Sequence, residues 1–259
     1  MAHKAIEIIY SDENLLVINK PSGISVTKDR GGDIDLLDAL AKQDKKCTEL
    51  RLIHRLDKLT SGVMALAKNP ETQSKYSSLF EKREIKKKYL VLATGFAGKT
   101  KGIVRTPLGR DRKDPTKMRF DKHGKRAITQ WSVLADFGFY ILIKAEPVTG
   151  RTHQIRVHMK EIGLPLAIDP LYGGTRPIML SDVKMRYNAK RGVEEKPLID
   201  RLTLHAYQLE LPGFETPFIA ELDKSFAATL KMLYKHNPKG SQAEVDEGVI
   251  AKIVDAQPI

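Results

Sequence analysis

The sequence predicts an α+β fold, with a mixed, largely antiparallel sheet and flanking helices. Strand-like segments outnumber helical ones and come mostly as adjacent pairs, whereas a doubly wound fold needs strands that alternate with helices. The 259 residues, 41% of them hydrophobic, suffice for a sizeable buried core, and neither a repeat nor a long linker divides them. We therefore expect one compact domain over residues 1–238, followed by a loosely ordered C-terminal tail over residues 239–259.

In the N-terminal part, two short apolar runs flank a polar turn and predict a strand hairpin over residues 6–10 and 15–19. The turn-forming segment Lys20-Pro21-Ser22-Gly23 then ends the second strand. Apolar residues at helical spacing predict a helix over residues 33–41, and an apolar run predicts a strand over residues 63–67.

The next segment has a clear helix start. Asn69 suits the N-cap and Pro70 the first helical position, so we expect a helix over residues 70–83. Residues 89–96 read as a strand. Residues 99–126 are predicted to be irregular, because they are rich in basic residues and are broken by glycine and proline.

The C-terminal half is predicted to hold a second hairpin, around Phe137-Gly138, then two helices and two strands. Gly163 closes the first of these helices. The expected ranges are 128–134 and 139–145 for the hairpin, 152–162 and 225–235 for the helices, and 204–211 and 218–222 for the strands.

The charge balance points to a polyanionic partner. Lys and Arg number 44 against 32 acidic residues, a formal net charge of +12, and such a surplus favours nucleic acid through counterion release. The alternative is that the excess charge only keeps the protein soluble.

The single cysteine cannot form an intramolecular disulfide, and no apolar run is long enough for a membrane span or a signal peptide. We therefore expect a cytoplasmic protein without a membrane partner.

Several common catalytic sites are absent from the sequence. There is no dinucleotide-binding glycine motif, no phosphate-binding P-loop and no nucleophile elbow. One cysteine excludes a cysteine-rich zinc site. His153 and His158 are five residues apart on a predicted helix, which turns them to different faces. No metal site is therefore predicted.

The densest run of polar groups, residues 51–62, leads directly into the predicted strand over residues 63–67. A loop on a rigid strand is a common place for a reactive carboxylate, here Asp57. The neighbouring cations Arg55 and Lys58 would keep Asp57 ionised, as a nucleophile requires. Spacing alone favours another interpretation, in which Asp57 accepts hydrogen bonds from Thr60 and Ser61 within a turn.

Four motifs, in order along the chain, resemble those of the RluA-type RNA pseudouridine synthases, in the short form that lacks an S4 domain. The resemblance covers about residues 6–235 and includes a match to the HRLDxxTSG signature. The motifs are Val17-Ile18-Asn19-Lys20-Pro21-Ser22-Gly23, His54-Arg55-Leu56-Asp57-Lys58-Leu59-Thr60-Ser61-Gly62, Lys86-Lys87-Lys88-Tyr89-Leu90-Val91-Leu92-Ala93-Thr94-Gly95 and Gly150-Arg151-Thr152-His153-Gln154-Ile155-Arg156-Val157-His158, followed by Asp169-Pro170-Leu171-Tyr172-Gly173.

The resemblance implies the pseudouridine synthase catalytic fold and a role for each of five residues. Asp57 is the catalytic aspartate, and Arg55 fills the space in the RNA that a flipped uridine leaves. Tyr89 stacks on the flipped uracil, and Ile155 lines the pocket for it. Arg156 pairs with Asp57 and keeps its carboxylate oriented and charged. Without the family, Tyr89 and Ile155 read as core residues and Arg55 as a surface arginine.

The implied reaction converts uridine in structured RNA to pseudouridine. The C1′–N1 bond breaks, the bound uracil turns, and C1′ joins C5. Neither redox change nor phosphate transfer occurs, so no cofactor is expected. The implied partner is ribosomal or transfer RNA, and no obligate protein partner is evident. Whether the aspartate attacks covalently or assists removal of a sugar proton stays open.

Other residues are expected to support the site. His54, Thr60, Ser61 and Gly62, with the segment Lys20-Pro21-Ser22-Gly23, are interpreted as scaffold for the Asp57 loop. Two basic groups are expected to contact phosphates, with a solvated charged face as the alternative. They are Lys82, Arg83, Lys86, Lys87 and Lys88 in the first group, and Arg110, Arg112, Lys113, Lys117, Arg119, Lys122, Lys125 and Arg126 in the second.

Two departures from the family pattern are visible. Ile168 stands before Asp169 where many relatives have glycine, so the backbone there is expected to run differently. We expect no S4 module in this chain, and we therefore expect substrate choice to come from the catalytic core and its loops. Two rival functions are a non-catalytic RNA-binding protein on the same scaffold and a metal-dependent nucleic-acid hydrolase. Asp57 argues against the first, and the lack of a ligand cluster argues against the second.

Overall fold

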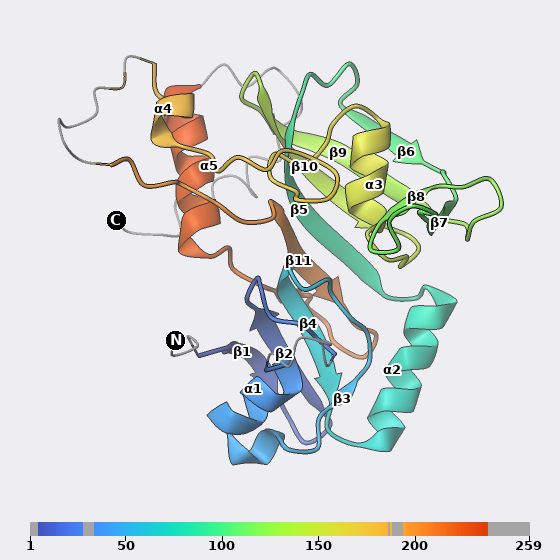
Figure 1. The fold of residues 1–259 in the computed structure, drawn as a ribbon. Helices are drawn as coiled ribbons and strands as arrows, with labels where there is room; N and C mark the ends of the chain where they lie inside the picture. Colours follow the sequence, from blue (N-terminus) through green and yellow to red (C-terminus); the bar gives the residue numbers. More distant parts are fainter. Residues whose placement is uncertain (1–4, 28–33, 186, 188–193, 238–259) are drawn as a thin grey trace. The chain divides into compact units, whose positions relative to one another are not determined.

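The structure, a computed structural model, describes residues 5–27, 34–185, 187 and 194–237 (Figure 1). The chain gathers into two compact units, each described here by itself. Unit 1 consists of Met1–Tyr89 and His205–Glu221, and unit 2 of Leu90–Leu204 and Leu222–Ile259. The single domain expected over residues 1–238 stays a prediction, and the expected tail over residues 239–259 lies outside the described residues.

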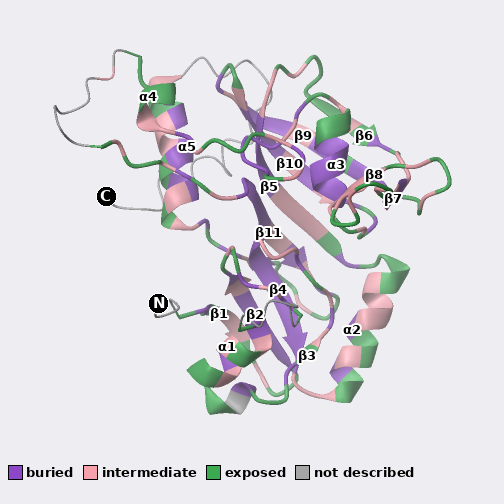
Figure 2. Cartoon of the chain, viewed as in Figure 1, coloured by how far each residue is buried: buried purple, intermediate pink, exposed green. Residues whose placement is uncertain are grey.

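The sheet of unit 1 is mixed. Its strand order is β1-β2-β4-β11, with β3 beside β4 and β12 beside β11. β4 and β11 run parallel, with Ser61 opposite His205, and the other strand pairs are antiparallel. All seven residues of β4 are buried, so this strand lies in the middle of the core of unit 1 (Figure 2). The strands are β1 (Glu7–Ser11), β2 (Leu15–Lys20), β3 (Arg51–Leu52), β4 (Ser61–Ala67), β11 (Leu204–Glu210) and β12 (Phe218–Ile219).

Two helices and a short 3-10 turn, η1 (Lys45–Cys47), complete unit 1. In α1 (Leu36–Gln43) the carboxylate of the N-cap residue Asp35 accepts the amide of Asp38 at 2.9 Å. In α2 (Pro70–Lys82) the side chain of Asn69 accepts the amide of Thr72 at 2.8 Å, with proline in the first position. Such caps satisfy amides that have no partner inside the helix.

Unit 2 contains the strand order β5-β10-β9-β6, in which β9 pairs antiparallel with β10 and with β6. β5 begins in unit 1 and ends in unit 2. α3 packs against β9 and β10, and β7 and β8 form a separate antiparallel hairpin (Figure 1). The strands are β5 (Lys86–Thr94), β6 (Lys101–Val104), β7 (Leu108–Arg110), β8 (Met118–Phe120), β9 (Thr129–Asp136) and β10 (Tyr140–Pro147).

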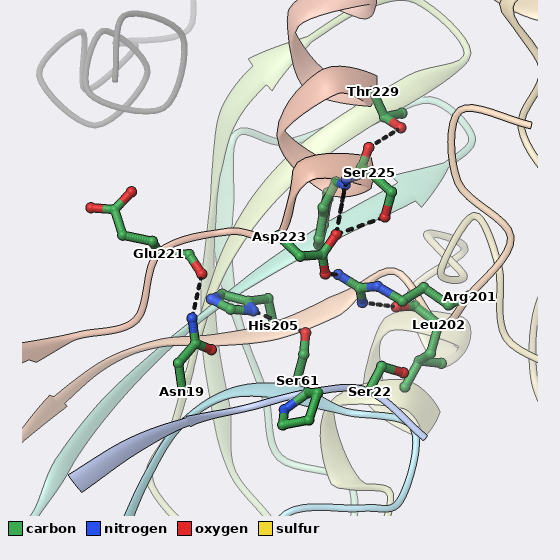
Figure 3. A network of polar contacts seen from close by, with 12 residues as sticks. Asn19, Ser22, Ser61, Arg201, Leu202, His205, Glu221, Asp223, Ser225 and Thr229 are labelled. Atoms are coloured by element: carbon green, nitrogen blue, oxygen red, sulfur yellow. Dashed lines mark hydrogen bonds and ion pairs between the residues drawn. The ribbon is translucent and has the colours of Figure 1, made fainter. Parts of the chain in front are cut away.

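The helices of unit 2 are α3 (Gln154–Glu161), α4 (Leu180–Val183) and α5 (Lys224–His236). The carboxylate of Asp223 caps α5 by accepting the amides of the first turn, and it also binds the guanidinium of Arg201 (Figure 3). Negative charge at a helix N-terminus opposes the positive end of the helix dipole, which stabilises α5. Among the described residues, no helix has both the length and the apolar composition needed to span a bilayer.

The α+β class and the mixed, mostly antiparallel sheet are confirmed. Both hairpins and the four expected helices are present, with ends that shift by up to three residues. The strand expected over residues 89–96 begins at Lys86 and ends at Thr94, because Gly95 has a φ of +119° that strand residues do not adopt. The helix expected from residue 152 begins at Gln154, since His153 has a left-handed backbone with a φ of 54°.

The prediction that residues 99–126 are irregular was wrong, because this segment forms β6, β7 and β8. The two strands of the β7–β8 hairpin have three residues each, too few for a readable alternation. They are held by their surroundings. Gly124 lies against the backbone of Leu108, where a Cβ would meet the carbonyl carbon at 2.4 Å, and the carboxylate of Asp111 accepts the amides of Lys113 and Asp114.

Candidate active site

Asp57 lies on a four-residue turn, residues 57–60, that leads directly into β4. The backbone amide of Thr60 donates to the backbone carbonyl of Asp57 at 3.1 Å, which closes the turn. Asp57 is partly buried, whereas Arg55 is exposed. The turn is thus closed by a backbone bond that does not use the Asp57 carboxylate.

A buried cation holds two more carbonyls of this turn. Lys20, at the end of β2, is fully buried. Its Nζ donates to the carbonyl oxygens of Thr60 at 2.9 Å, Lys58 at 3.1 Å and Pro21 at 2.9 Å. A charge in the interior is tolerated only when hydrogen bonds replace its water, and an ammonium has three protons to donate. Lys20 therefore crosslinks the end of β2 to the turn.

The residues after Lys20 complete this set of bonds. The hydroxyl of Ser22 donates to the carbonyl of Leu59 at 2.6 Å, and the amide of Gly23 donates to the carbonyl of Lys58 at 2.9 Å. Each of the four backbone carbonyls of the 57–60 turn thus accepts at least one hydrogen bond. This agrees with the scaffold role expected for residues 20–23.

β11 supports the turn where it enters β4. Gly62 has a φ of +115°, and a Cβ there would lie 2.1 Å from the carbonyl oxygen of Ala206, so only glycine fits. The buried Ser61 hydroxyl lies 2.9 Å from Nδ1 of His205 (Figure 3). Nε2 of His205 lies 3.0 Å from the carbonyl oxygen of Ala220. These contacts anchor the two residues that follow the turn.

His54 supports β4 from the other end of the motif. Its Nε2 accepts the backbone amide of Ala65 at 3.1 Å, and its ring stacks on Phe80 with the centroids 4.4 Å apart. Burial, with a smaller contribution from the nearby ammonium of Lys87, lowers the pKa of His54 to about 3. An imidazole that stays neutral and accepts a backbone bond is a structural element, which agrees with the scaffold role expected for His54.

The structure brings Tyr89 and Asp57 into electrostatic contact. Tyr89 lies on β5 and packs against the core of unit 1. Burial raises the pKa of the Tyr89 phenol well above its ordinary value of 10, and the Asp57 carboxylate raises it further. The phenol therefore keeps its proton at every physiological pH and can act as a hydrogen-bond donor.

Ile155 and Arg156 lie in the first turn of α3 in unit 2, and both are buried. Nε and Nη2 of Arg156 donate to the two carboxylate oxygens of Asp169 at 2.8 and 2.7 Å. The guanidinium also lies over the ring of Tyr172, 5.0 Å from its centroid. Two parallel bonds and a stacked face fix the plane of this guanidinium. The expected pairing of Arg156 with Asp57 stays a prediction.

Asp169, the partner of Arg156, has no role in the predictions from sequence. It is fully buried, and Oδ1 also accepts the amides of Leu171 and Tyr172 at 2.9 and 3.2 Å. The signal that could have identified it is its position in the Asp-Pro-Leu-Tyr-Gly segment after the Arg156 motif. Ile168, the residue before Asp169, is buried, and its amide donates to the Thr203 hydroxyl at 3.2 Å. The different backbone course expected there stays a prediction.

The two basic groups differ in their surroundings. In the first, Lys86 and Lys88 lie 3.3 and 4.0 Å from the carboxylate of Glu210, and Lys87 lies over the ring of Phe80. The second group occupies β7, β8 and their loops, and the following side chains in it are exposed: Arg110, Arg112, Lys113, Lys122, Lys125 and Arg126. The second group therefore has more exposed cationic side chains than the first, and its contact with RNA stays a prediction.

Within the described part of the chain, no group of three or more histidine, cysteine, aspartate or glutamate side chains is arranged to hold a metal ion. Unit 2 has a cavity of about 500 Å³ that none of the five predicted site residues lines. Its walls are formed by Thr94, Phe137, Phe139, Tyr140, Ala167, Gly174, Thr175, Arg176, Pro177, Ile178, Asp182 and Asn237.

Residues 14–161 match a family model described as RNA pseudouridylate synthase. Ribosomal large subunit pseudouridine synthase D of Nitrosomonas europaea is 37% identical over 211 residues, which is 80% of this chain and 58% of that protein. The uncharacterized RNA pseudouridine synthase YlyB of Bacillus subtilis is 37% identical over 183 residues, 67% of this chain and 59% of that protein. The chain thus spans less than two thirds of these two relatives.

A relative of similar length also matches. An uncharacterized RNA pseudouridine synthase of Zymomonas mobilis is 34% identical over 232 residues, which cover 86% of this chain and 96% of that protein. Among solved structures, human RNA pseudouridylate synthase domain containing 4 superposes with a TM-score of 0.68 at 28% identity, covering 88% of this chain and 92% of that one.

Proposed function

The chain belongs to the RNA pseudouridylate synthase family, and we propose that it isomerises specific uridines in structured RNA to pseudouridine, with Asp57 as the catalytic carboxylate. The fixed turn that carries Asp57 is the observation that best supports this role. Four hydrogen-bonded carbonyls and two anchored residues after the turn restrict the backbone at Asp57. Catalysis depends on holding a reactive group within a fraction of an ångström, and this turn can do so.

The chemistry proposed at this site needs a carboxylate and a proton donor. The C1′–N1 bond of the uridine breaks, the uracil turns, and a C1′–C5 bond forms. The C5 proton then leaves and N1 gains a proton, so the product is an isomer of the substrate. Asp57 either attacks the nucleoside covalently or assists removal of a sugar proton. The Tyr89 phenol, whose high pKa keeps it protonated, is proposed to stack on the uracil and to donate a hydrogen bond.

Three further residues have proposed roles in substrate binding. Arg55 is exposed two residues before Asp57, and its guanidinium is proposed to occupy the space that the flipped uridine leaves. Ile155 is proposed to line the uracil pocket. Arg156 is proposed to orient the Asp57 carboxylate, a role supported by the bidentate contact with Asp169 that fixes the guanidinium plane.

The proposed substrate is ribosomal RNA, with transfer RNA as the alternative. Relatives at 34% to 37% identity carry names that specify the ribosomal large subunit. The net charge of +12 supports a polyanionic substrate, and the exposed basic residues of the β7–β8 segment are proposed to bind phosphates. We also propose that the protein acts in the cytoplasm, without a cofactor or an obligate protein partner.

The test is tritium release from RNA labelled at C5 of uridine. RNA from cells that lack this gene serves as substrate, so that the target uridine is unmodified. Wild-type protein should release tritium, because forming the C1′–C5 bond expels the C5 hydrogen. Asp57→Asn has nearly the same shape and should bind RNA but release none.

Each other outcome counts against part of the proposal. Equal release by both proteins would remove Asp57 from the mechanism. RNA binding without release by either protein would favour the rival interpretation, a non-catalytic RNA-binding protein. Fractionating the labelled RNA by size would separate ribosomal from transfer RNA as the substrate.

A further inference from the structure

We propose that His205 is a positioning residue that sets the geometry of Asp57 through the hydroxyl of Ser61. This inference rests on the proposed function, in which Asp57 is catalytic. His205 and Ser61 are 1% and 3% exposed, so neither is placed to contact an RNA substrate. Their distance of 2.9 Å joins two strands that are 144 residues apart in the sequence. The role of His205 is therefore to support Asp57.

The hydrogen bonds of His205 define its tautomer. Nε2 lies 3.0 Å from the carbonyl oxygen of Ala220, which can only accept, so Nε2 carries the ring proton. A neutral imidazole then has an acceptor at Nδ1, and the Ser61 hydroxyl donates to it at 2.9 Å. The Ser61 hydroxyl thereby has a fixed direction, because its proton is committed to His205.

The position of Ser61 explains how its bond to His205 can affect Asp57. Ser61 immediately follows the 57–60 turn, whose other side is held by Lys20, Ser22 and Gly23 through its carbonyls. His205 therefore supplies the side-chain contact on the β11 side, next to the backbone packing of Gly62 on Ala206. Because the turn is short, a displacement at Ser61 reaches Asp57 through only four peptide units.

Two amide substitutions separate the two bonds of His205. In His205→Asn, the side-chain oxygen takes the place of Nδ1 and can still accept from Ser61, but the side chain no longer reaches the carbonyl of Ala220. In His205→Gln, the side-chain amide reaches the place of Nε2 and can donate to Ala220, but the acceptor for Ser61 is lost. Ser61→Ala removes the same bond from the other side. If His205 acts through Ser61, His205→Gln and Ser61→Ala should behave alike and His205→Asn should not.

The first measurement is kcat and KM for tritium release, at a temperature where every variant is folded. His205→Gln and Ser61→Ala should lower kcat by about 10-fold to 100-fold with little change in KM, as expected for a misplaced catalytic group. His205→Asn should keep kcat within about threefold of wild type. The double variant His205→Gln/Ser61→Ala should have a kcat no lower than that of the slower single variant, because both substitutions remove the same hydrogen bond.

Asn69→Ala is the control for general destabilisation. It removes the N-cap of α2, a helix that carries none of the five site residues, and should lower stability without lowering kcat. The inference is overturned if Asn69→Ala lowers kcat as much as His205→Gln. It is also overturned if His205→Asn and His205→Gln lower kcat equally.

A second readout separates this inference from the proposed function. Hydrogen exchange of the backbone amides over residues 57–62 reports the order of the turn without any substrate. Faster exchange in His205→Gln than in His205→Asn supports the positioning role even if the wild type proves inactive, which would refute only the proposed function. Equal exchange in both variants would overturn the positioning role whatever the activity.

Discussion

The neutral state of His54 predicts a specific loss of stability in mild acid. In the folded protein the pKa of His54 is about 3, whereas an imidazole in the unfolded chain titrates near 6.5. Lowering the pH through 6.5 therefore protonates the unfolded state first and stabilises it. The stabilisation from neutral His54 is complete above pH 6.5 and declines as the pH falls toward 3.

The size of this effect follows from the two pKa values. Between pH 7 and pH 5 the unfolded imidazole goes from about one quarter protonated to almost fully protonated, while the folded one gains almost no proton. The free energy of unfolding should then fall by about 2 kcal/mol on account of this residue. This loss in the free energy of unfolding is an upper limit, because the His54 side chain keeps some exposure to solvent.

The comparison variant is His54→Gln, whose side-chain oxygen can reach the amide of Ala65 but cannot titrate. Urea unfolding followed at pH 7 and at pH 5 gives the free energy for both proteins, and contributions from the other histidines cancel in the difference. Wild type should lose about 2 kcal/mol more than His54→Gln over this interval. Parallel losses in the two proteins would show that His54 is protonated in the folded state, and the assignment of a neutral acceptor would be wrong.

Three other substitutions, one of them with a comparison variant, test the support of the Asp57 turn and the Arg156 site. Lys20→Met should lower the free energy of unfolding by about 3 kcal/mol, since the carbonyls it bonds lose a buried donor; a change below about 1 kcal/mol would contradict this. Gly62→Ala should prevent folding or lower the free energy of unfolding by more than about 4 kcal/mol. Gly23→Ala, at a residue with positive φ but no atom within 4 Å of the added Cβ, should lower it by only about 1–2 kcal/mol. Equal losses would refute the clash with Ala206. Arg156→Lys keeps the charge but cannot make two parallel bonds to Asp169, so thermal unfolding should show a loss of about 2 kcal/mol, and an unchanged midpoint would contradict the bidentate contact.

Local sequence signals predicted those parts of the fold that local physics decides. Asn69 and Pro70 specify the start of α2 because a cap and a fixed φ act within one turn of helix. The hairpin of β9 and β10 follows from two apolar runs around a glycine turn. The strands of the β7–β8 hairpin were not predicted, because their own composition does not indicate strands. Hydrogen bonds from outside the strands stabilise them, such as the bond from the amide of Lys125 to the carbonyl of Leu108.

The roles and partners of the candidate site residues were harder to predict from the nearby sequence. Spacing alone did not distinguish a catalytic Asp57 from a turn-forming one, and the four ordered motifs were needed to favour the first. The partner of Ser61 lies 144 residues away, so nothing near Ser61 in the sequence points to His205. Asp169, only 13 residues from Arg156, was within reach of a charge-pair argument, but the choice among nearby acids depends on how the chain turns after α3.

The hydrogen bonds of the turn bear on the alternative in which Asp57 is only a turn-forming residue. That interpretation requires its carboxylate to accept from Thr60 or Ser61. The amide of Thr60 donates to the backbone carbonyl of Asp57, and the hydroxyl of Ser61 is bonded to His205. Among the described residues, the buried hydroxyl of Thr60 has no hydrogen-bond partner at all. The turn is thus held by Lys20, by backbone bonds and by β11, and neither the Thr60 nor the Ser61 hydroxyl donates to the Asp57 carboxylate as that interpretation requires.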